Sequence, residues 1–413
     1  QLETIWIVLI LLIATRFGGI IANKFNQPVL VGELLAGVAL GIIAAQLSDR
    51  SIGVEISSDH HLMALADLGI FFLMLLGGYE MRPKDLVESS YKGLVIAVTA
   101  MLVPLLSGFA LAWYSIAASE LRFAQSLFVG VSLAITAVPV TIRVFMDMHI
   151  LKSALAKLVV SAAVFDDFLS LILLSVLVAI INTGQLPTVL SLAFILTKVA
   201  VFLVVVFFIG SRLMAPLARY AASLKIEEMN FSFLLVIAAL FSVLAELLGL
   251  HFILGAFAAG LFYGKHTTSK KIYLDLHSKL KAITTGFLAP LFFASIGLAL
   301  SFPALVEIPQ FLMLLIVVAF GGKLLGAALP AVVFGYSPRQ ACAIGMAMNA
   351  RGAVGLIIAG IALDAGLFVG GETLSPVVDN LFSAIVIVVI LTTVLAPIGL
   401  KKLLPETDSS MAD

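Results

Sequence analysis

Long apolar runs separated by short polar segments make up most of the chain. A helix needs about 20 apolar residues to cross the hydrocarbon core of a bilayer, and thirteen runs approach or exceed that length. The pattern predicts an all-α polytopic membrane protein, with one transmembrane domain over residues 1–404 and a short polar cytoplasmic tail over 405–413. We predict spans at 3–23, 28–46, 62–79, 92–117, 124–147, 152–182, 188–213, 229–248, 251–264, 284–300, 309–334, 340–366 and 379–400.

The composition agrees with this class and argues against several others. Of the 413 residues, 62% are hydrophobic and 12% are charged, whereas soluble domains are about 45–50% apolar and about 25% charged. The 24 basic and 24 acidic residues balance, and no basic tract indicates a nucleic-acid partner. The single cysteine, Cys342, excludes an intramolecular disulfide and a cysteine-based metal site. No phosphate-binding loop and no grouping of catalytic residues is recognisable, so neither an ATP-driven pump nor an enzyme is indicated.

Lysine and arginine are distributed unevenly between the predicted connections. Nineteen of the 24 fall in the odd-numbered connections and the C-terminal tail, and only Arg50 and Arg122 fall on the other side. Cytoplasmic loops of membrane proteins are rich in lysine and arginine. We therefore expect a multi-pass protein of the cell (inner) membrane, with its N-terminus outside and its C-terminus in the cytoplasm.

Thirteen spans divide as six, one and six, and this division predicts two inverted six-helix repeats. Six spans return the chain to its starting side, so a linker helix at about 188–213 inverts the second half. The fifth and twelfth spans occupy equivalent positions, and both contain residues that interrupt helices: Pro139 in the fifth, and Asn349, Arg351 and glycines in the twelfth. Matched interrupted helices point to the binding site of a transporter. We expect crossed discontinuous helices 5 and 12, with simple packing kinks as the alternative.

Two adjacent carboxylates, Asp166 and Asp167, lie in an otherwise apolar run. A charge at the bilayer centre costs on the order of 3 kcal/mol, and neighbouring acids repel each other unless a positive charge is close. Successive helical residues point about 100° apart, so one acid can face a water-filled path while the other faces a neighbouring helix. Lys323, flanked by glycines that permit close helix approach, is the expected partner of one of them. A static ion pair is the alternative, and it also leaves the other aspartate without a partner.

An unpaired aspartate in such a cavity can bind both a proton and a cation. Desolvation and the adjacent carboxylate favour its protonated form, so it can exchange a proton near physiological pH. Hard cations take oxygen ligands, and Thr136, Thr141, Asn349 and unwound backbone carbonyls can complete a shell around Na⁺. Competition between proton and cation for one carboxylate is sufficient for obligatory exchange.

Further residues are candidates for supporting roles. Pro139 and Arg351 are expected to support the helix breaks, Arg351 by capping carbonyls freed in the twelfth span. Glu33 and Glu246 lie near helix ends or within spans. For each of them, capping or a structural salt bridge is one possibility and a role in the ion path is the other. Lys198 lies about a third of the way along the seventh span, from where its ammonium group can reach the interface.

Four segments carry a family resemblance, and they are specific only in combination. They are Asn-Gln-Pro-Val-Leu-Val-Gly-Glu at 26–33, Phe-Asp-Asp at 165–167, Gly-Lys-Leu-Leu-Gly at 322–326 and Arg-Gly-Ala-Val-Gly-Leu at 351–356. With these segments the chain resembles, over nearly its whole length, the sodium/proton antiporters of the monovalent cation:proton antiporter superfamily.

The resemblance implies a dimerisation domain, a mobile core domain with crossed broken helices, and elevator-like alternating access. It also implies that Asp167 carries the proton and the Na⁺ ion, that Asp166 pairs with Lys323, and that the transported ions are the only cofactors. The double acid is similar to the electrogenic branch. Pro139 departs from the small residue typical of close sodium-selective relatives, which leaves the cation open among Na⁺, Li⁺ and K⁺.

The expected function is therefore exchange of cytoplasmic Na⁺ for external protons, in pH homeostasis, by a homodimer in the lipid bilayer. The alternative is a sodium-coupled symporter of an organic anion with the same crossed-helix architecture. Such a symporter needs polar or cationic groups around a larger pocket, and the sequence offers few. A passive channel does not need a titratable carboxylate pair.

Overall fold

The computed structural model describes residues 2–47, 60–84, 90–183, 188–224, 226–264, 267–298, 303–351, 358, 362, 367–368 and 376–404. Within these ranges the chain is helical between short connections and contains no β-strand. Its helices are α1 (Leu2–Lys24), α2 (Val29–Leu47), α4 (His60–Glu80), α6 (Ser90–Ser115), α7 (Arg122–Ala134), α8 (Val138–Asp147), α9 (Ala154–Thr183), α10 (Val189–Arg212), α11 (Met214–Ser223), α12 (Met229–Leu247), α13 (Phe252–Phe262), α14 (Lys270–Ile283), the π-helical turn η1 (Thr284–Leu288), α15 (Ala289–Leu298), α16 (Pro303–Glu307), α17 (Pro309–Val333), α18 (Pro338–Ala347), α20 (Pro376–Asp379) and α21 (Leu381–Leu403).

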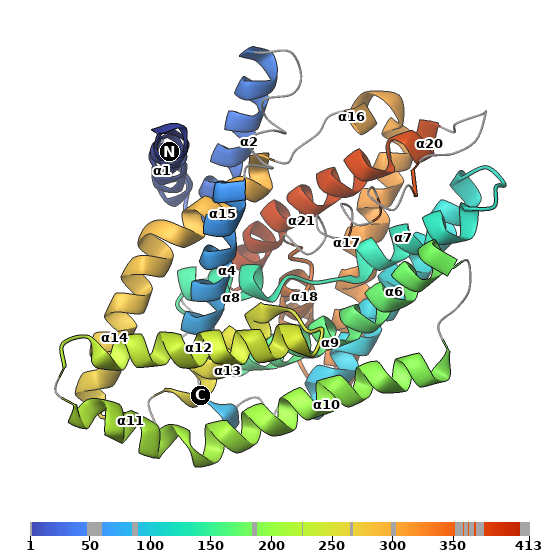
Figure 1. Cartoon of the computed structure of the whole chain (residues 1–413). Coiled ribbons are helices and arrows are strands. Elements are labelled where there is room, and N and C mark those ends of the chain that lie inside the picture. Colours follow the sequence, from blue (N-terminus) through green and yellow to red (C-terminus); the bar gives the residue numbers. More distant parts are fainter. Residues whose placement is uncertain are drawn as a thin grey trace.

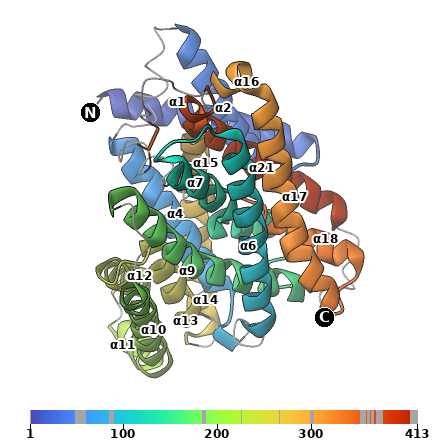
Figure 2. The ribbon, with the colours of Figure 1, turned by 90° about the vertical axis from the view of Figure 1, so that its right-hand side faces the viewer.

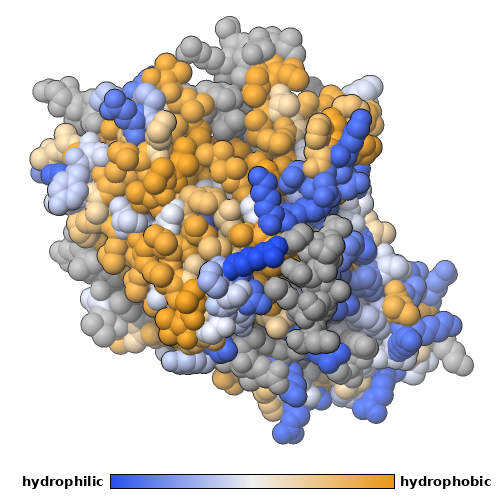
Figure 3. Space-filling view, turned by 180° about the vertical axis from the view of Figure 1, so that it is seen from behind, coloured by the Kyte–Doolittle hydropathy of each residue, from blue (hydrophilic) through white to orange (hydrophobic). Residues whose placement is uncertain are grey.

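The lengths and surfaces of these helices confirm an all-helical polytopic membrane protein. The described residues include ten helices long and apolar enough to cross a membrane, with α7 and α8 counted together, and the shorter apolar helices α2 and α13. Large apolar side chains such as Phe17, Leu106 and Val333 are exposed, where a bilayer stabilises them. Figure 3 shows apolar residues covering a large part of one face, with hydrophilic residues gathered toward one side of it.

The thirteen-span count and the inverted repeats stay predictions. Much of the second half of the twelfth predicted span, from residue 352 onward, lies outside the described residues. The polar tail at 405–413 also lies outside them.

The fifth predicted span is broken, as the sequence indicated. Helix α7 ends at Ala134, the next three residues are not helical, and α8 begins at Val138. Pro139 lies in the first turn of α8, where its missing N–H costs nothing and its fixed φ suits the start of a helix. The proline therefore ends the interruption and starts the second half-helix.

The prediction for the tenth span was wrong at its start. The sequence indicated a helix from residue 284, but α14, η1 and α15 form one continuous helical segment from Lys270 to Leu298. The first part is polar and amphipathic, with only Leu276 and Leu280 buried. Hydropathy therefore assigned it to a loop, although one face of it packs against α4 and α12.

The helices pack in two groups (Figure 1). In one group α6 packs against α7, α9 and α17, and α17 packs against α18. In the other, α1 and α15 pack against α2, and α13 packs against α4 and α12. Figures 1 and 2 both place α10 to α13 together at one edge of the molecule, while α6 and α17 lie side by side (Figure 2). Helix α8 lies between the groups, because it contacts α9 as well as α2 and α4.

Candidate ion-binding site

The break in the fifth span lies beside the end of α18 and is joined to the residues after it by a backbone hydrogen bond. Ile135 and Ala137, in the break between α7 and α8, have extended backbone conformations. The N–H group of Ala137 donates to the carbonyl oxygen of Ala350, at 2.9 Å. Ala350 follows the end of α18, which is the described first half of the twelfth predicted span. The predicted break and second half-helix of that span lie outside the described residues.

Two threonine hydroxyls of the fifth span also contact the end of α18. Thr136 Oγ1 donates to the carbonyl oxygen of Met348 at 3.2 Å, and Thr141 Oγ1 donates to that of Ala347 at 3.1 Å. The last carbonyls of a helix lack intrahelical partners, and the hydroxyls supply them. Both threonines were predicted to form the cation cavity. Here their hydroxyl protons hold α18 against α8, and their oxygen lone pairs remain as acceptors.

Two groups stabilise the negative charge of Asp166, the ammonium group of Lys323 and a backbone N–H group. Its carboxylate lies 3.3 and 3.4 Å from Lys323 Nζ, and both side chains are 0% exposed. Its Oδ2 atom also accepts a hydrogen bond from the backbone N–H of Thr136 at 2.8 Å. That N–H lies just before α8, at the end of the helix where the macrodipole favours a negative charge.

Glycines beside Lys323 allow α17 to approach α6 closely. A Cβ atom on Gly322 would lie 3.1 Å from Pro104 of α6, and one on Gly326 would lie 2.6 Å from the carbonyl oxygen of Thr99. Any larger side chain at Gly326 would push α17 away from α6. The predicted close helix approach around Lys323 is confirmed for these two glycines, whereas Gly321 has no neighbour within 4 Å.

Asp167 is in a different position from its neighbour. Its Oδ2 atom is buried, and it has no hydrogen-bond partner among the described residues. The hydroxyl of Ser170, buried on the same helix, also lacks a partner. Because residues three apart lie on the same side of a helix, Ser170 is a candidate oxygen ligand next to Asp167. The sequence analysis did not select it, although this spacing was visible.

Arg351 contacts the break in the fifth span. Its Nη2 atom donates to the carbonyl oxygens of Leu133, at 2.7 Å, and Ala319, at 2.9 Å. Leu133 lies at the end of α7, so Arg351 caps a carbonyl freed in the fifth span. The residues after Arg351, where it was expected to cap carbonyls of the twelfth span, lie outside the described residues. The positive guanidinium also lies near the C-terminal end of α7, where the helix dipole is negative, and this interaction is favourable.

Asn349 keeps one oxygen available. Its Nδ2 atom donates to the carbonyl oxygen of Phe320 at 2.9 Å and to that of Gly345 at 3.4 Å. Its Oδ1 atom is buried without a hydrogen bond in the described part of the chain. The amide is therefore oriented by its nitrogen, and its oxygen remains free to bind a cation.

The remaining candidates lie away from this centre. Glu33 on α2 is fully buried and lies 3.4 Å from Arg143 Nη2 on α8, and Arg143 Nε lies 3.1 Å from Asp147. Glu33 thus makes the structural salt bridge that was one of its two predicted possibilities. Glu246 is exposed near the end of α12, outside both buried clusters. Lys198 lies over the ring of Phe194, 4.8 Å from its centroid.

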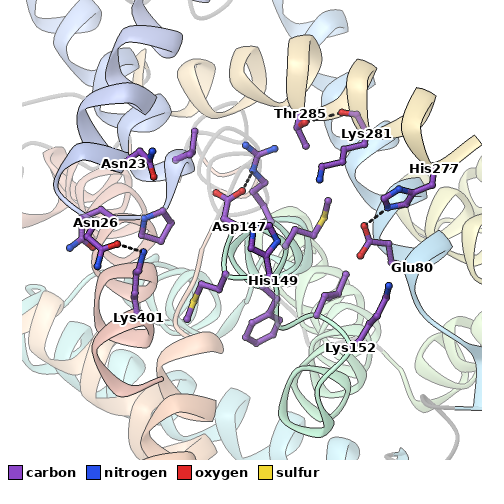
Figure 4. Close-up of a pocket in the computed structure, with 18 of the residues that line it drawn as sticks. Asn23, Asn26, Glu80, Asp147, His149, Lys152, His277, Lys281, Thr285 and Lys401 are labelled. Atoms are coloured by element: carbon purple, nitrogen blue, oxygen red, sulfur yellow. Dashed lines mark hydrogen bonds and ion pairs between the residues drawn. The ribbon is translucent and has the colours of Figure 1, made fainter. Parts of the chain in front are cut away.

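A polar cavity of about 690 Å³ adjoins the Glu33 cluster. It lies on the side of the molecule where the lysine-rich connections gather, and its lining includes Arg143 and Asp147. Figure 4 shows two further pairs across it: His277 with Glu80 at 2.8 Å, and Lys401 with Asn26 at 3.0 Å. Neither Asp166 nor Asp167 lines this cavity.

The geometry defines a class of protein. A bundle of membrane-spanning helices, with an interrupted span beside buried opposite charges, is typical of an ion-coupled membrane transporter. Within the described residues, no group of three or more histidine, cysteine, aspartate or glutamate side chains is arranged to hold a resident metal ion.

Comparison with known proteins identifies the family. The family described as "Sodium/hydrogen exchanger, transmembrane" matches residues 8–405. The chain belongs to this sodium/hydrogen exchanger family, whose members are transporters rather than enzymes and use the transported ions without a further cofactor.

Individual relatives are similar over their whole lengths. The Na(+)/H(+)-K(+) antiporter GerN of Bacillus cereus is 28% identical over 411 residues, which cover 100% of this chain and 99% of the relative. The Na(+)/H(+) antiporter of Enterococcus hirae is 27% identical over 400 residues, covering 97% and 98%. These relatives are named antiporters, so the organic-anion symporter is not favoured.

A solved structure shows the same fold. The sodium proton antiporter MjNhaP1 of Methanocaldococcus jannaschii at pH 8 superposes with a TM-score of 0.60 at 18% identity, covering 97% of this chain and 96% of that one. At this identity the similarity concerns the fold alone.

Proposed function

We propose that the protein exchanges Na⁺ for protons across the membrane, with Asp167 carrying either ion. The observation that carries this proposal is the unequal pairing of two adjacent acids. Lys323 and the Thr136 N–H neutralise Asp166, whereas a buried oxygen of Asp167 has no partner among the described residues. A buried carboxylate oxygen without a partner is costly, and binding either a proton or a cation removes that cost.

The oxygen atoms around the break can complete a cation shell. Asn349 Oδ1 and Ser170 Oγ are buried and have no hydrogen-bond partner within the described residues, and the hydroxyl oxygens of Thr136 and Thr141 keep acceptor capacity. Because a hard monovalent cation needs several oxygen ligands, Asp167 alone does not suffice. Na⁺ is the first candidate from the names of the relatives, and Li⁺ and K⁺ are the others.

Transport then requires the site to face each side in turn. We propose elevator-like movement of the group containing α6, α9, α17 and α18 against the group containing α1, α2, α13 and α15. The two packing groups, and the hydrogen bond between Ala137 and Ala350, support this division. We further propose that thirteen spans form two inverted repeats, with α10 as the helix that links them. The protein would act as a homodimer in the cell (inner) membrane, with its C-terminus in the cytoplasm.

Purified protein in proteoliposomes with an internal pH dye tests the exchange. A Na⁺ pulse should move protons, and a series with Li⁺ and K⁺ should define the cation. If both ions bind Asp167, the apparent KM for Na⁺ should rise as pH falls, while the rate at saturating Na⁺ should change much less. An imposed membrane potential should alter the rate if exchange is electrogenic.

Two variants separate this assignment from general damage. Asp167→Asn should reduce exchange to the level of protein-free vesicles. Glu246→Gln, which changes an exposed acid outside the site, should exchange like the parent. Exchange by Asp167→Asn at the parent rate would show that another group carries the ions.

A further inference from the structure

A second cavity of about 640 Å³ lies between α9, α10 and α13. Its lining is apolar except for Ser211 and Arg212, near the end of α10. Val164 and Phe168, three residues before and one residue after Asp167, form part of the α9 wall. The groove therefore runs along the helix that holds the carrier acid and does not include the acid itself.

The groove is open on the side of α10. Val204 and Phe207 of this helix are 68% and 57% exposed, whereas Phe257 of the opposite wall is 3% exposed. Helix α10 approaches α13 closely at Gly210, where a Cβ atom would lie 2.3 Å from the ring of Phe262. Apolar side chains of α10, among them Val204 and Phe207, and of α13, among them Leu254 and Phe257, line the same cavity.

Arg212 adds a positive charge at one end of this space. It occupies the last turn of α10 and is exposed. Within the described residues its guanidinium has no ion pair or hydrogen bond, unlike Arg143 and Arg351. Arginine binds phosphate oxygens through two parallel hydrogen bonds, so this end of the groove fits a phosphate group.

We infer that this groove is a phospholipid site, with an acyl chain between α10 and α13 and an anionic headgroup on Arg212. An apolar cavity is unfavourable for water, and left empty it loses the dispersion contacts of its walls. Arg212 lies ten residues after Phe202, a rise of about 15 Å along α10, so a chain anchored at Arg212 reaches the level of Phe202. Two of the walls, α9 and α10, are helices long and apolar enough to span a membrane, and α13 is a shorter apolar helix, which makes a lipid the available occupant.

A bound acyl chain also keeps water away from one side of α9. The chain would lie against Val164 and Phe168, next to Asp167 in sequence. Water reaching the carrier through the groove would dissipate the ion gradient without exchange. The site therefore seals the helix from a direction that ions do not use, whichever cation is exchanged.

Tryptophan fluorescence tests the acyl-chain part of this inference. In a Trp6→Phe, Trp113→Phe background, Phe207→Trp places a probe in the groove. Phe194→Trp places a control on the same helix at similar exposure, 61%, outside the groove. The delipidated full-length protein is titrated in detergent micelles with phosphatidylglycerol brominated on its acyl chains. The groove probe should be quenched saturably at a low lipid-to-protein ratio, and the control only in proportion to total lipid. Equal quenching of both would overturn the acyl-chain site.

Two further experiments test the binding of the headgroup to Arg212 and the location of the acyl chain in the cavity. Brominated phosphatidylcholine should need about fivefold more lipid for half-saturation, as expected for one arginine near an anionic headgroup, and Arg212→Gln should remove the difference. Equal half-saturation by both lipids in the parent would overturn the role of Arg212.

Ala258→Phe, which fills the groove from α13, should abolish saturable quenching while size-exclusion elution and proton exchange persist. Saturable quenching retained in that variant would place the lipid elsewhere.

Discussion

Two buried clusters of opposite charge join helices in this protein, and they differ in how the charges are shared. At the centre, Lys323 contacts Asp166, and a buried oxygen of Asp167 has no partner among the described residues. Toward the lysine-rich side, Arg143 contacts both acids of its cluster, Glu33 at 3.4 Å and Asp147 at 3.1 Å.

The difference indicates separate roles for the two clusters. An arginine that contacts both acids of its cluster can act as a fixed connection between α2 and α8. The oxygen of Asp167 that has no partner in the described part of the chain can instead bind a mobile ion. The pairing of the charges, rather than burial alone, is therefore the basis for proposing Asp167 as the carrier.

The largest effect is expected from removing the unpaired acid. Asp167→Asn removes the proposed carrier, and exchange measured in proteoliposomes should fall to background. The melting temperature of the purified variant should stay equal to that of the parent or rise, since a charge with an unpartnered buried oxygen in the described part of the chain is lost. A marked fall in melting temperature would mean that Asp167 is a structural partner like Asp166.

Breaking the central pair should reduce stability as well as transport. Lys323→Met leaves Asp166 buried without its cation, at a cost of about 3–5 kcal/mol, measured by thermal or denaturant unfolding in detergent. The double variant Asp166→Asn, Lys323→Met should recover most of that stability. If the single and double variants were equally unstable, Lys323 would be supporting the fold through packing rather than through the ion pair.

Breaking the second cluster should affect stability more than transport. Arg143→Met leaves Glu33 buried and unpaired, and we expect a loss of about 3 kcal/mol, at the lower end for a buried pair because Asp147 retains 14% exposure. Glu33→Gln in the same background should restore part of it. Exchange per folded protein should stay within a few-fold of the parent. Complete loss of exchange in a stable Arg143→Met, Glu33→Gln variant would make this cluster part of the ion path.

The smallest effect is expected from the threonine that joins α8 to α18. Thr141→Val removes one hydrogen bond to the Ala347 carbonyl and should cost about 1 kcal/mol of stability. The apparent KM for Na⁺ should change little if the hydroxyl only holds α8 against α18. A large rise in KM with unchanged stability would show that Thr141 is a cation ligand. Thr392→Val, which removes a hydroxyl bonded only within α21, is the matched control.

The spans and the break could be predicted because their signals are local. Apolar runs mark the helices, and Pro139 marks the start of α8, which begins four residues after the last residue of α7. Local signals could not show which residues of different helices contact each other. Lys323 is 157 residues from Asp166, and only the family resemblance, not spacing, assigned it to that acid. The contact of Arg351 with the carbonyl oxygen of Leu133, 218 residues away, likewise could not be predicted from spacing.

By itself, the sequence determined the membrane class, the position of most helices, and the presence of an acid pair that needs compensation within an apolar span. These follow from composition and from the backbone preferences of neighbouring residues. The tertiary structure alone decided which acid is compensated, that Arg143 holds Glu33, and that α14 continues into α15. The physical reason is that electrostatic pairing depends on distances of a few ångströms between helices, and helix packing sets those distances.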